Sequence, residues 1–359
     1  MTVSPASMGR RPSRHRGVLV LLLCLLVGSM LLGAGAGAVK IPASHILATV
    51  AEKAGLRGML EFLGLAWPEV TELEATVLHA IRLPRVLLAA LVGGALGLSG
   101  AVLQGLFRNP LADPGLLGIS SGATLAVSGA IVLHLASLGL YTLPLAAFAG
   151  SLTCMLVIQI FARHDRRTNV ATMLLAGIAI NSLCGAGTGL FTYFSSEDQL
   201  RAITFWMLGS LSGATWTSVG AAAPLILPGL LILPLLAGPM NAMLLGESTA
   251  QHLGVRVEWV KALVVLLIAL GVGAGVAVSG MIGFVGLIVP NLIRIWTGPN
   301  HHVLLPASAL LGSALLVLAD MAARTVVAPL ELPLGIVTAA LGAPFFLILL
   351  VRQRRTGEL

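Results

Sequence analysis

The groups that could do covalent chemistry are sparse in this chain and follow no catalytic pattern. Its lysines are Lys40, Lys53 and Lys261, and none follows a glycine, so the phosphate-binding loop G-x-x-x-x-G-K-[ST] is absent. The metal-binding and redox patterns H-E-x-x-H and C-x-x-C are absent as well. We therefore expect neither catalysis nor nucleotide binding by such a loop. If the chain transports a ligand actively, a partner protein or an ion gradient must supply the energy.

The arginines offer a different chemistry, the recognition of carboxylates. Arg82 and Arg85, in the string RLPR, and Arg324, in LADMAART, lie at the ends of apolar runs. A guanidinium binds a carboxylate through two parallel hydrogen bonds, most strongly where water is partly excluded. The alternative is that these side chains extend to lipid headgroups. The net charge of +7 does not predict nucleic-acid binding, because the basic residues lie in short segments between apolar runs.

The composition is that of a membrane protein. Hydrophobic residues make up 57% of the 359 residues and charged residues 10%, whereas soluble proteins contain about 25% charged residues. The mean hydropathy is +0.99, and the 42 glycines suit helices that pack closely in lipid. Cys24, Cys154 and Cys184 are odd in number and lie in apolar runs, so we expect small apolar side chains and no structural disulfide bonds. The sequence predicts an all-α integral membrane protein and excludes a soluble enzyme, a disordered chain and a disulfide scaffold.

Apolar runs bounded by charge, glycine or proline predict ten transmembrane helices, each of which needs about 20 apolar residues. The run 282–296 is short and contains Gly283, Gly286 and Pro290, so we expect it to be kinked or partly re-entrant. The predicted spans are 17–38, 82–107, 115–134, 141–162, 170–194, 215–237, 259–279, 282–296, 303–324 and 334–351.

Three further segments need separate interpretation. The arginines of residues 10–16, followed by the apolar run 17–38, also fit a secretory signal peptide. That run is long enough to span a bilayer, so we expect it to be retained as the first helix. Residues 39–81 are predicted to form a polar, partly helical external loop, and 197–212 an interfacial helix anchored by Trp206.

The distribution of Lys and Arg predicts the orientation. Of the 21 basic residues, 14 fall on one side of the ten spans and 7 on the other. The richer side is expected to be cytoplasmic, which places both termini in the cytoplasm. We expect a single permease domain over 17–351, between a basic N-terminus at 1–16 and a basic C-terminus at 352–359.

Residues 239–257 are predicted to contribute a cytoplasmic knob of two short helices. Asn241 can cap the first helix, which Gly246 would end, and a second helix over 247–253 would end at Gly254. Such a knob could lie in a groove of another protein and transmit its movement. From the residues alone, an amphipathic loop on the membrane surface fits equally well.

The string LGESTAQHLGV resembles the coupling-helix region of the FecCD-type permeases, which import iron chelates, heme and vitamin B12 into bacteria. The segments 81–123, 279–294 and 331–346 are similar to the same family, in the same order. The resemblance implies a type II ABC importer fold with ten transmembrane helices per subunit, like that of the vitamin B12 permease. It also implies a homodimer with a central pathway in the bacterial inner membrane, two cytoplasmic ATPase subunits that bind ATP and Mg²⁺, a periplasmic binding protein and no permanently bound cofactor.

The resemblance also assigns roles to individual positions. Arg82, Arg85 and Arg324 would receive acidic residues of the binding protein, and Asn169, Val170 and Ala171 would form the cytoplasmic gate, although these three also fit a simple helix start. The fifth span would line the pathway and the dimer contact through Asn181, Gly185 and Gly189, although small-x-x-x-small motifs often serve packing within one subunit. The residues expected to dock into the ATPase are Gly246, Glu247, Ser248, Ala250, Leu253 and Gly254.

The ligand is expected to be heme, delivered by a periplasmic heme-binding protein, because residues 171–216 are similar to the heme-importing branch of the family. A ferric siderophore or cobalamin is the alternative within the same class. A gradient-driven secondary transporter is the alternative of a different class. Such a carrier usually places ionisable residues at mid-membrane, and the middles of the ten predicted spans contain no Asp, Glu, Lys or Arg.

Overall fold

The computed structural model describes residues 11–37, 39–53, 55, 68, 70–164 and 167–356. Residues 1–10 and 357–359, which belong to the two predicted basic termini, lie outside the described residues. Within the described part, the regular structure is helical apart from one antiparallel hairpin, β1 (Arg163–His164) and β2 (Arg167–Thr168).

Ten apolar helices match the ten predicted spans one for one. In the described residues, seven helical segments are long and apolar enough to cross a membrane, and the three shorter apolar helices include residues 119–132, 285–297 and 334–348. Our prediction of an all-α membrane fold is therefore confirmed. The ten helices are α1 (Arg11–Gly35), α5 (Leu83–Leu106), α6 (Ile119–Val132), α7 (Thr142–Ala162), α8 (Val170–Tyr193), α10 (Trp216–Ile232), α13 (Val257–Ser279), α14 (Val285–Thr297), α15 (His301–Thr325) and α16 (Leu334–Thr356).

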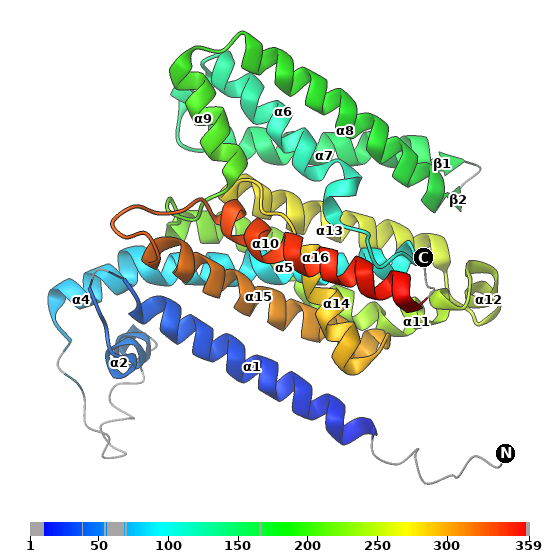
Figure 1. Cartoon of the computed structure of the whole chain (residues 1–359), viewed down its shortest axis with the longest axis horizontal. Coiled ribbons are helices and arrows are strands. Elements are labelled where there is room, and N and C mark those ends of the chain that lie inside the picture. Colours follow the sequence, from blue (N-terminus) through cyan, green and yellow to red (C-terminus); the bar gives the residue numbers. More distant parts are fainter. Residues whose placement is uncertain are drawn as a thin grey trace.

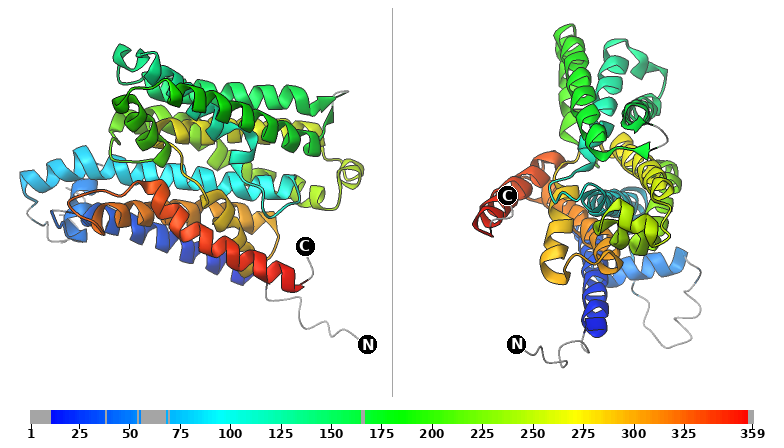
Figure 2. Two further views of the ribbon diagram at one scale, coloured as in Figure 1. Left: turned by 45° about the horizontal axis from the view of Figure 1, so that its top comes forward. Right: turned by 90° about the vertical axis from the view of Figure 1, so that its right-hand side faces the viewer.

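Short elements occupy the two ends of the bundle (Figure 1). One end, which we call the α2 end, carries α2 (Ala43–Lys53), α4 (Glu72–Val77) and α9 (Glu197–Leu208). The opposite end, the α12 end, carries α11 (Ala237–Leu244), α12 (Glu247–His252) and the β1–β2 hairpin. The start of α1 and the end of α16 both point toward the α12 end (Figure 2). The other short helices of the described residues are η2 (Leu78–Arg82), η3 (Pro114–Leu117), η4 (Leu135–Leu138) and η5 (Leu233–Leu236).

Helix α5 forms the centre of the bundle. It packs against α15, α14, α10 and α13, while α6, α7 and α8 form a separate group that joins the bundle through α13. The most apolar stretch of the α5 segment is 83% buried, whereas that of α8 is only 17% buried. Although α8 packs against α6 and α7, most of its residues are therefore exposed or half-buried in the single chain.

Glycine permits the closest contact of the core, between α5 and α15. A Cβ atom on Gly93 would lie 2.3 Å from the carbonyl oxygen of Gly312, and a Cβ on Gly312 would lie 2.3 Å from that of Gly93. The two backbones can approach this closely only because both residues lack a side chain. The motif of Gly93 and Gly97 thus serves packing within one chain.

Two predicted boundaries differ most from the structure. The span predicted at 82–107 is part of a continuous helical segment from Glu72, because Thr71 and Glu74 form a capping box and the π-helical η2 joins α4 to α5. These first turns are polar, so hydropathy alone did not include them. Likewise, α10 continues through η5 and α11 to Leu244. Asn241 therefore lies inside a helix and does not cap one.

Other local predictions agree with the structure. Helix α12 follows Gly246 and is followed by Gly254, whose φ of +84° favours glycine. Helix α9 covers most of the predicted interfacial segment, and α14 is short and contains Pro290.

Candidate functional site

At the α2 end, the side chain of Arg82 is folded into the protein. Arg82 is 4% exposed, and its Nη1 donates hydrogen bonds to the carbonyl oxygens of Ala34 at 2.8 Å and Gly35 at 2.9 Å. Its Nη2 donates to the carbonyl oxygen of Val39. These carbonyls belong to the end of α1 and to the segment that follows, where a helix leaves its last carbonyls without partners. Arg82 therefore caps α1 from a neighbouring helix.

Arg324 completes the same cap from α15. Its guanidinium donates hydrogen bonds to the carbonyl oxygen of Ala36 at 2.9 Å and to that of Gly33. Its Nε also lies 3.5 Å from a carboxylate oxygen of Asp320, one helical turn earlier. Two arginines from different helices thus hold the outer part of α1.

Arg85 has carboxylate partners instead of carbonyl partners. Its Nε lies 3.0 Å from both oxygens of Asp320, and its two terminal nitrogens each donate to a different oxygen of Glu331 at 3.0 Å. The side chain of Arg85 is 8% exposed and that of Asp320 is 2% exposed, whereas Glu331 is 41% exposed. The cluster is thus a buried ion pair with one carboxylate at its edge.

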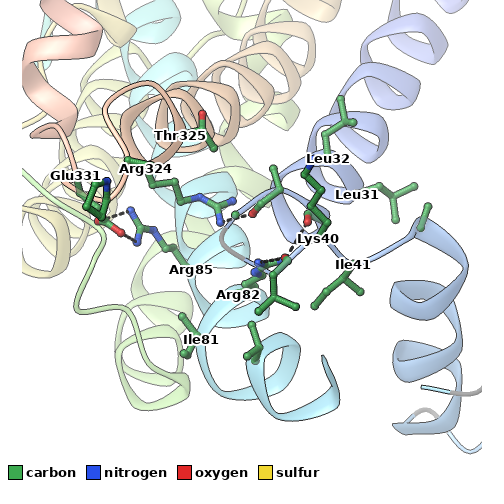
Figure 3. Close-up of a pocket in the computed structure, with 18 residues that line it drawn as sticks. Leu31, Leu32, Lys40, Ile41, Ile81, Arg82, Arg85, Arg324, Thr325 and Glu331 are labelled. Carbon is green, nitrogen blue, oxygen red and sulfur yellow. Dashed lines mark hydrogen bonds and ion pairs between the residues drawn. The ribbon is translucent and has the colours of Figure 1, made fainter. Parts of the chain in front are cut away.

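A pocket of about 1090 Å³ lies beside these three arginines (Figure 3). Its wall combines apolar side chains from α1 and η2 with the charged groups of the cluster and of Lys40. The structure therefore brings the three predicted docking residues together around one concave surface. It also shows that each of them already has hydrogen-bond partners inside the chain.

At the α12 end, the predicted coupling residues face in two directions. Ser248 and Leu253 are exposed, while Ala250 is fully buried. Glu247 turns inward and accepts a hydrogen bond from the Nζ of Lys261 at 2.7 Å. Only part of α12 is therefore free to contact another protein.

The predicted gate residues lie at the start of α8. Asn169 is the N-cap, and its Oδ1 accepts hydrogen bonds from the main-chain N–H groups of Ala171 at 2.9 Å and Thr172 at 3.2 Å. Asn169 and Ala171 are exposed, and Val170 is half-buried. These residues follow β2 directly, so their position depends on how the hairpin is held.

Along α8, the predicted pathway residues separate into two sets. Asn181 faces the chain, because its Nδ2 donates to the carbonyl oxygen of Gly115 at 3.2 Å. Gly185 and Gly189 face outward, where an added Cβ would meet nothing within 4 Å. Their neighbours Leu183 and Leu190 are 67% and 58% exposed. The glycine motif of α8, unlike that of α5, is not used within the chain.

Sequence reasoning missed the charged residues that organise both ends, namely Asp320, Glu331, Glu258 and Lys261. Asp320 could have been found, because an acid four residues before Arg324 on one helix forms a favourable pair. The pair of Glu258 and Lys261, three residues apart on one helix, gave a similar signal. The contact of Lys261 with Thr168 gave none, since the two residues are 93 positions apart in the sequence.

Comparison with known proteins gives a consistent result. Residues 7–352 match the FecCD transport family. The hemin transport system permease protein of Yersinia pestis is 52% identical over 277 residues, which cover 76% of this chain and 83% of that protein. The cobalamin import system permease protein of Halobacterium salinarum is 43% identical over 308 residues and covers 82% of each chain.

A solved structure supports the same conclusion. An ABC transporter assigned to the metal-chelate type, in an inward-facing conformation, has a TM-score of 0.80 and 31% identity, covering 94% of this chain and 99% of that one. Permease subunits of this kind are not themselves enzymes. Sequence and fold agree, and the chain belongs to the FecCD transport family as a permease of an ABC importer.

Proposed function

We propose that the chain is the permease subunit of an importer that moves heme from the periplasm to the cytoplasm by alternating access. The observation that carries this proposal is the 52% identity to a hemin permease, against 43% for a cobalamin permease. The difference favours heme over cobalamin, and a ferric siderophore remains the alternative ligand. In the proposed orientation, the α12 end and both termini face the cytoplasm and the α2 end faces the periplasm.

The proposed assembly is a homodimer joined along α8. The support is the long exposed apolar face of this helix, together with the open space at Gly185 and Gly189. Small residues on an exposed face allow two helices to approach closely in lipid. The central pathway would then lie between the two copies of α8.

We propose that two ATPase subunits bind the exposed face of α12, which carries Ser248, Gln251 and Leu253. The energy for transport would come from ATP bound with Mg²⁺ in those subunits. Asn169, Val170 and Ala171, at the same end, would open and close the inner end of the pathway.

A periplasmic heme-binding protein is proposed to dock at the α2 end. Carboxylates bind guanidinium groups more strongly than neutral carbonyls do. Arg82 and Arg324, which bind main-chain carbonyls, are therefore the positions that an incoming acidic residue could engage by exchange. Arg85 already binds two carboxylates, so we expect it to stabilise the site without binding the partner protein.

Reconstitution in liposomes tests this function. The chain would be combined with its cognate ATPase and binding protein, and uptake of heme, a ferric siderophore and cyanocobalamin would be compared. We expect ATP-dependent uptake of heme only. Uptake of another ligand in place of heme would contradict the heme assignment but leave the permease role intact. The double substitution R82Q/R324Q should weaken capture of the binding protein, and unchanged capture would remove these arginines from docking.

A further inference from the structure

Lys261 is a buried cation that none of the roles above uses. It lies in the first turns of α13, at the α12 end, and its side chain is 1% exposed. An ammonium group removed from water is tolerated only where charged or polar partners replace the lost hydration. The partners of Lys261 therefore show which elements this side chain connects.

The Nζ of Lys261 has three acceptors, which matches its three N–H donors. It donates to the carbonyl oxygen of Thr168 at 2.8 Å, to Oε2 of Glu247 at 2.7 Å and to Oε1 of Glu258 at 3.2 Å. Glu247 belongs to α12 and Thr168 to β2. One ammonium group thus joins two elements that belong to different parts of the chain.

Glu258 strengthens the hold on Thr168. Its Oε2 accepts a hydrogen bond from the main-chain N–H of Thr168 at 2.8 Å. Both main-chain polar groups of Thr168 are therefore bound by side chains of α13. Thr168 is followed directly by Asn169, the N-cap of α8, so the start of α8 is fixed by the same contacts.

These contacts form a continuous path from α12 to α8. It runs from Glu247 to Lys261, from Lys261 to Thr168, and from there to the N-cap at Asn169. Because the Glu247 carboxylate points inward, the exposed side of α12 remains available to a partner while its inner side is attached to the path. We infer that Lys261 is a positioning residue that transmits displacement of α12 to the first turn of α8. This inference rests on the proposed function, since an ATPase must be what displaces α12.

Glu247→Ala is the sharpest test, because it cuts the path at α12 and leaves Lys261 paired with Glu258 and Thr168. Lys261→Met removes the charge and the donors, and Lys261→Arg keeps both. Arg108→Gln is the matched control, because Arg108 is an exposed cation near the same end of the bundle, at the end of α5. All variants would be studied in the full complex with the cognate ATPase.

The first measurement is hydrogen exchange with and without ATP. In the parent complex, we expect ATP to change the exchange of residues 247–254 and also of residues 163–172. In the Glu247→Ala complex, the change at 247–254 should remain and the change at 163–172 should be lost. The same ATP-dependent change at 163–172 in parent, Glu247→Ala and Lys261→Met complexes would overturn the inference.

The parent complex also separates the two proposals. If ATP alters exchange at 247–254 but not at 163–172, the path is wrong and the proposed function stands. If ATP alters neither segment in an assembled complex, α12 is not a coupling helix, and both proposals fail.

The second measurement is heme uptake per ATP hydrolysed. Glu247→Ala and Lys261→Met should lower this ratio by about tenfold, the size of a typical coupling between two sites. Lys261→Arg should restore most of it, and Arg108→Gln should match the parent. A purely structural role would instead lower assembly, hydrolysis and uptake together, and that outcome would also overturn the inference.

Discussion

Among single residues at the α2 end, Arg85 is a buried cation that binds two carboxylates. It binds Asp320, which is 2% exposed, and Glu331, which is 41% exposed. If Arg85 were removed, water could hydrate the carboxylate of Glu331 but could hardly reach that of Asp320. The contribution of each pair should therefore differ, although their hydrogen-bond distances are alike.

Arg85→Gln is expected to lower the stability of the chain by about 3–5 kcal/mol, because it leaves the buried carboxylate of Asp320 without its main partner. Glu331→Gln should cost about 0–1 kcal/mol, since that carboxylate is near the surface and Arg85 keeps Asp320. Apparent melting temperatures in detergent would measure both. Equal losses would contradict the assigned burial.

Asp113, between α5 and η3, should make the stability of the folded protein depend on pH. Burial raises the pKa of its carboxyl above 3.8, against the opposing effect of the hydrogen bond from the N–H of Gly115. The folded state therefore binds this proton more tightly than the unfolded state. The stabilisation that results is complete below pH 3.8 and is lost as the pH rises through the raised value.

Asp113→Asn keeps an acceptor for Gly115 and cannot become charged. The variant should therefore gain stability relative to the parent as the pH increases from about 4 to 7. Melting temperatures of the two proteins across this range would give the comparison. Parallel curves would show that the carboxyl does not titrate differently on unfolding.

At the scale of helices, the two glycine motifs should respond differently to a methyl group. Gly93→Ala places a Cβ against the carbonyl oxygen of Gly312 in α15 and should cost about 1–3 kcal/mol. Gly185→Ala meets open space within the chain, so the stability of the monomer should not fall and should rise by up to about 1 kcal/mol, because alanine favours the helix more than glycine does. Melting temperatures of the monomeric variants in detergent would measure both effects.

The same position tests the proposed dimer. Gly185→Leu should reduce the dimeric fraction measured by light scattering, because a bulky side chain would separate two copies of α8. Gly185→Ala serves as the control. A dimer that tolerates leucine at this position would show that the subunits join elsewhere.

The spans could be predicted from the sequence because lipid requires long apolar helices whose backbone groups are satisfied internally. The boundaries at Glu72 and Leu244 could not be predicted in this way, since the helices continue into polar or proline-containing turns. The role of Lys261 was beyond prediction for another reason, although its pair with Glu258 is local. Its role depends on a contact between residues 93 positions apart, which no local pattern records.

For the whole molecule, the distribution of Lys and Arg predicts that the α12 end faces the cytoplasm, and cysteine labelling tests this orientation. The three cysteines would be replaced by serine, and a single cysteine introduced at Glu197 in α9 or at Gln251 in α12, both exposed. A membrane-impermeant maleimide should label position 197 in spheroplasts and position 251 only in inverted vesicles. The reverse pattern would invert the proposed direction of transport.

The way in which Thr168 is held has a consequence for divergence within the family. Lys261 donates to the main-chain carbonyl oxygen of Thr168, and Glu258 accepts from its main-chain N–H, so neither bond involves the hydroxyl of Thr168. Any residue of similar size could serve there, except proline, which has no N–H to donate. The side chain at this position can therefore change without loss of these two main-chain hydrogen bonds. A relative that transports another ligand could therefore differ in the sequence of residues 163–168 and still keep the proposed coupling between α12 and α8.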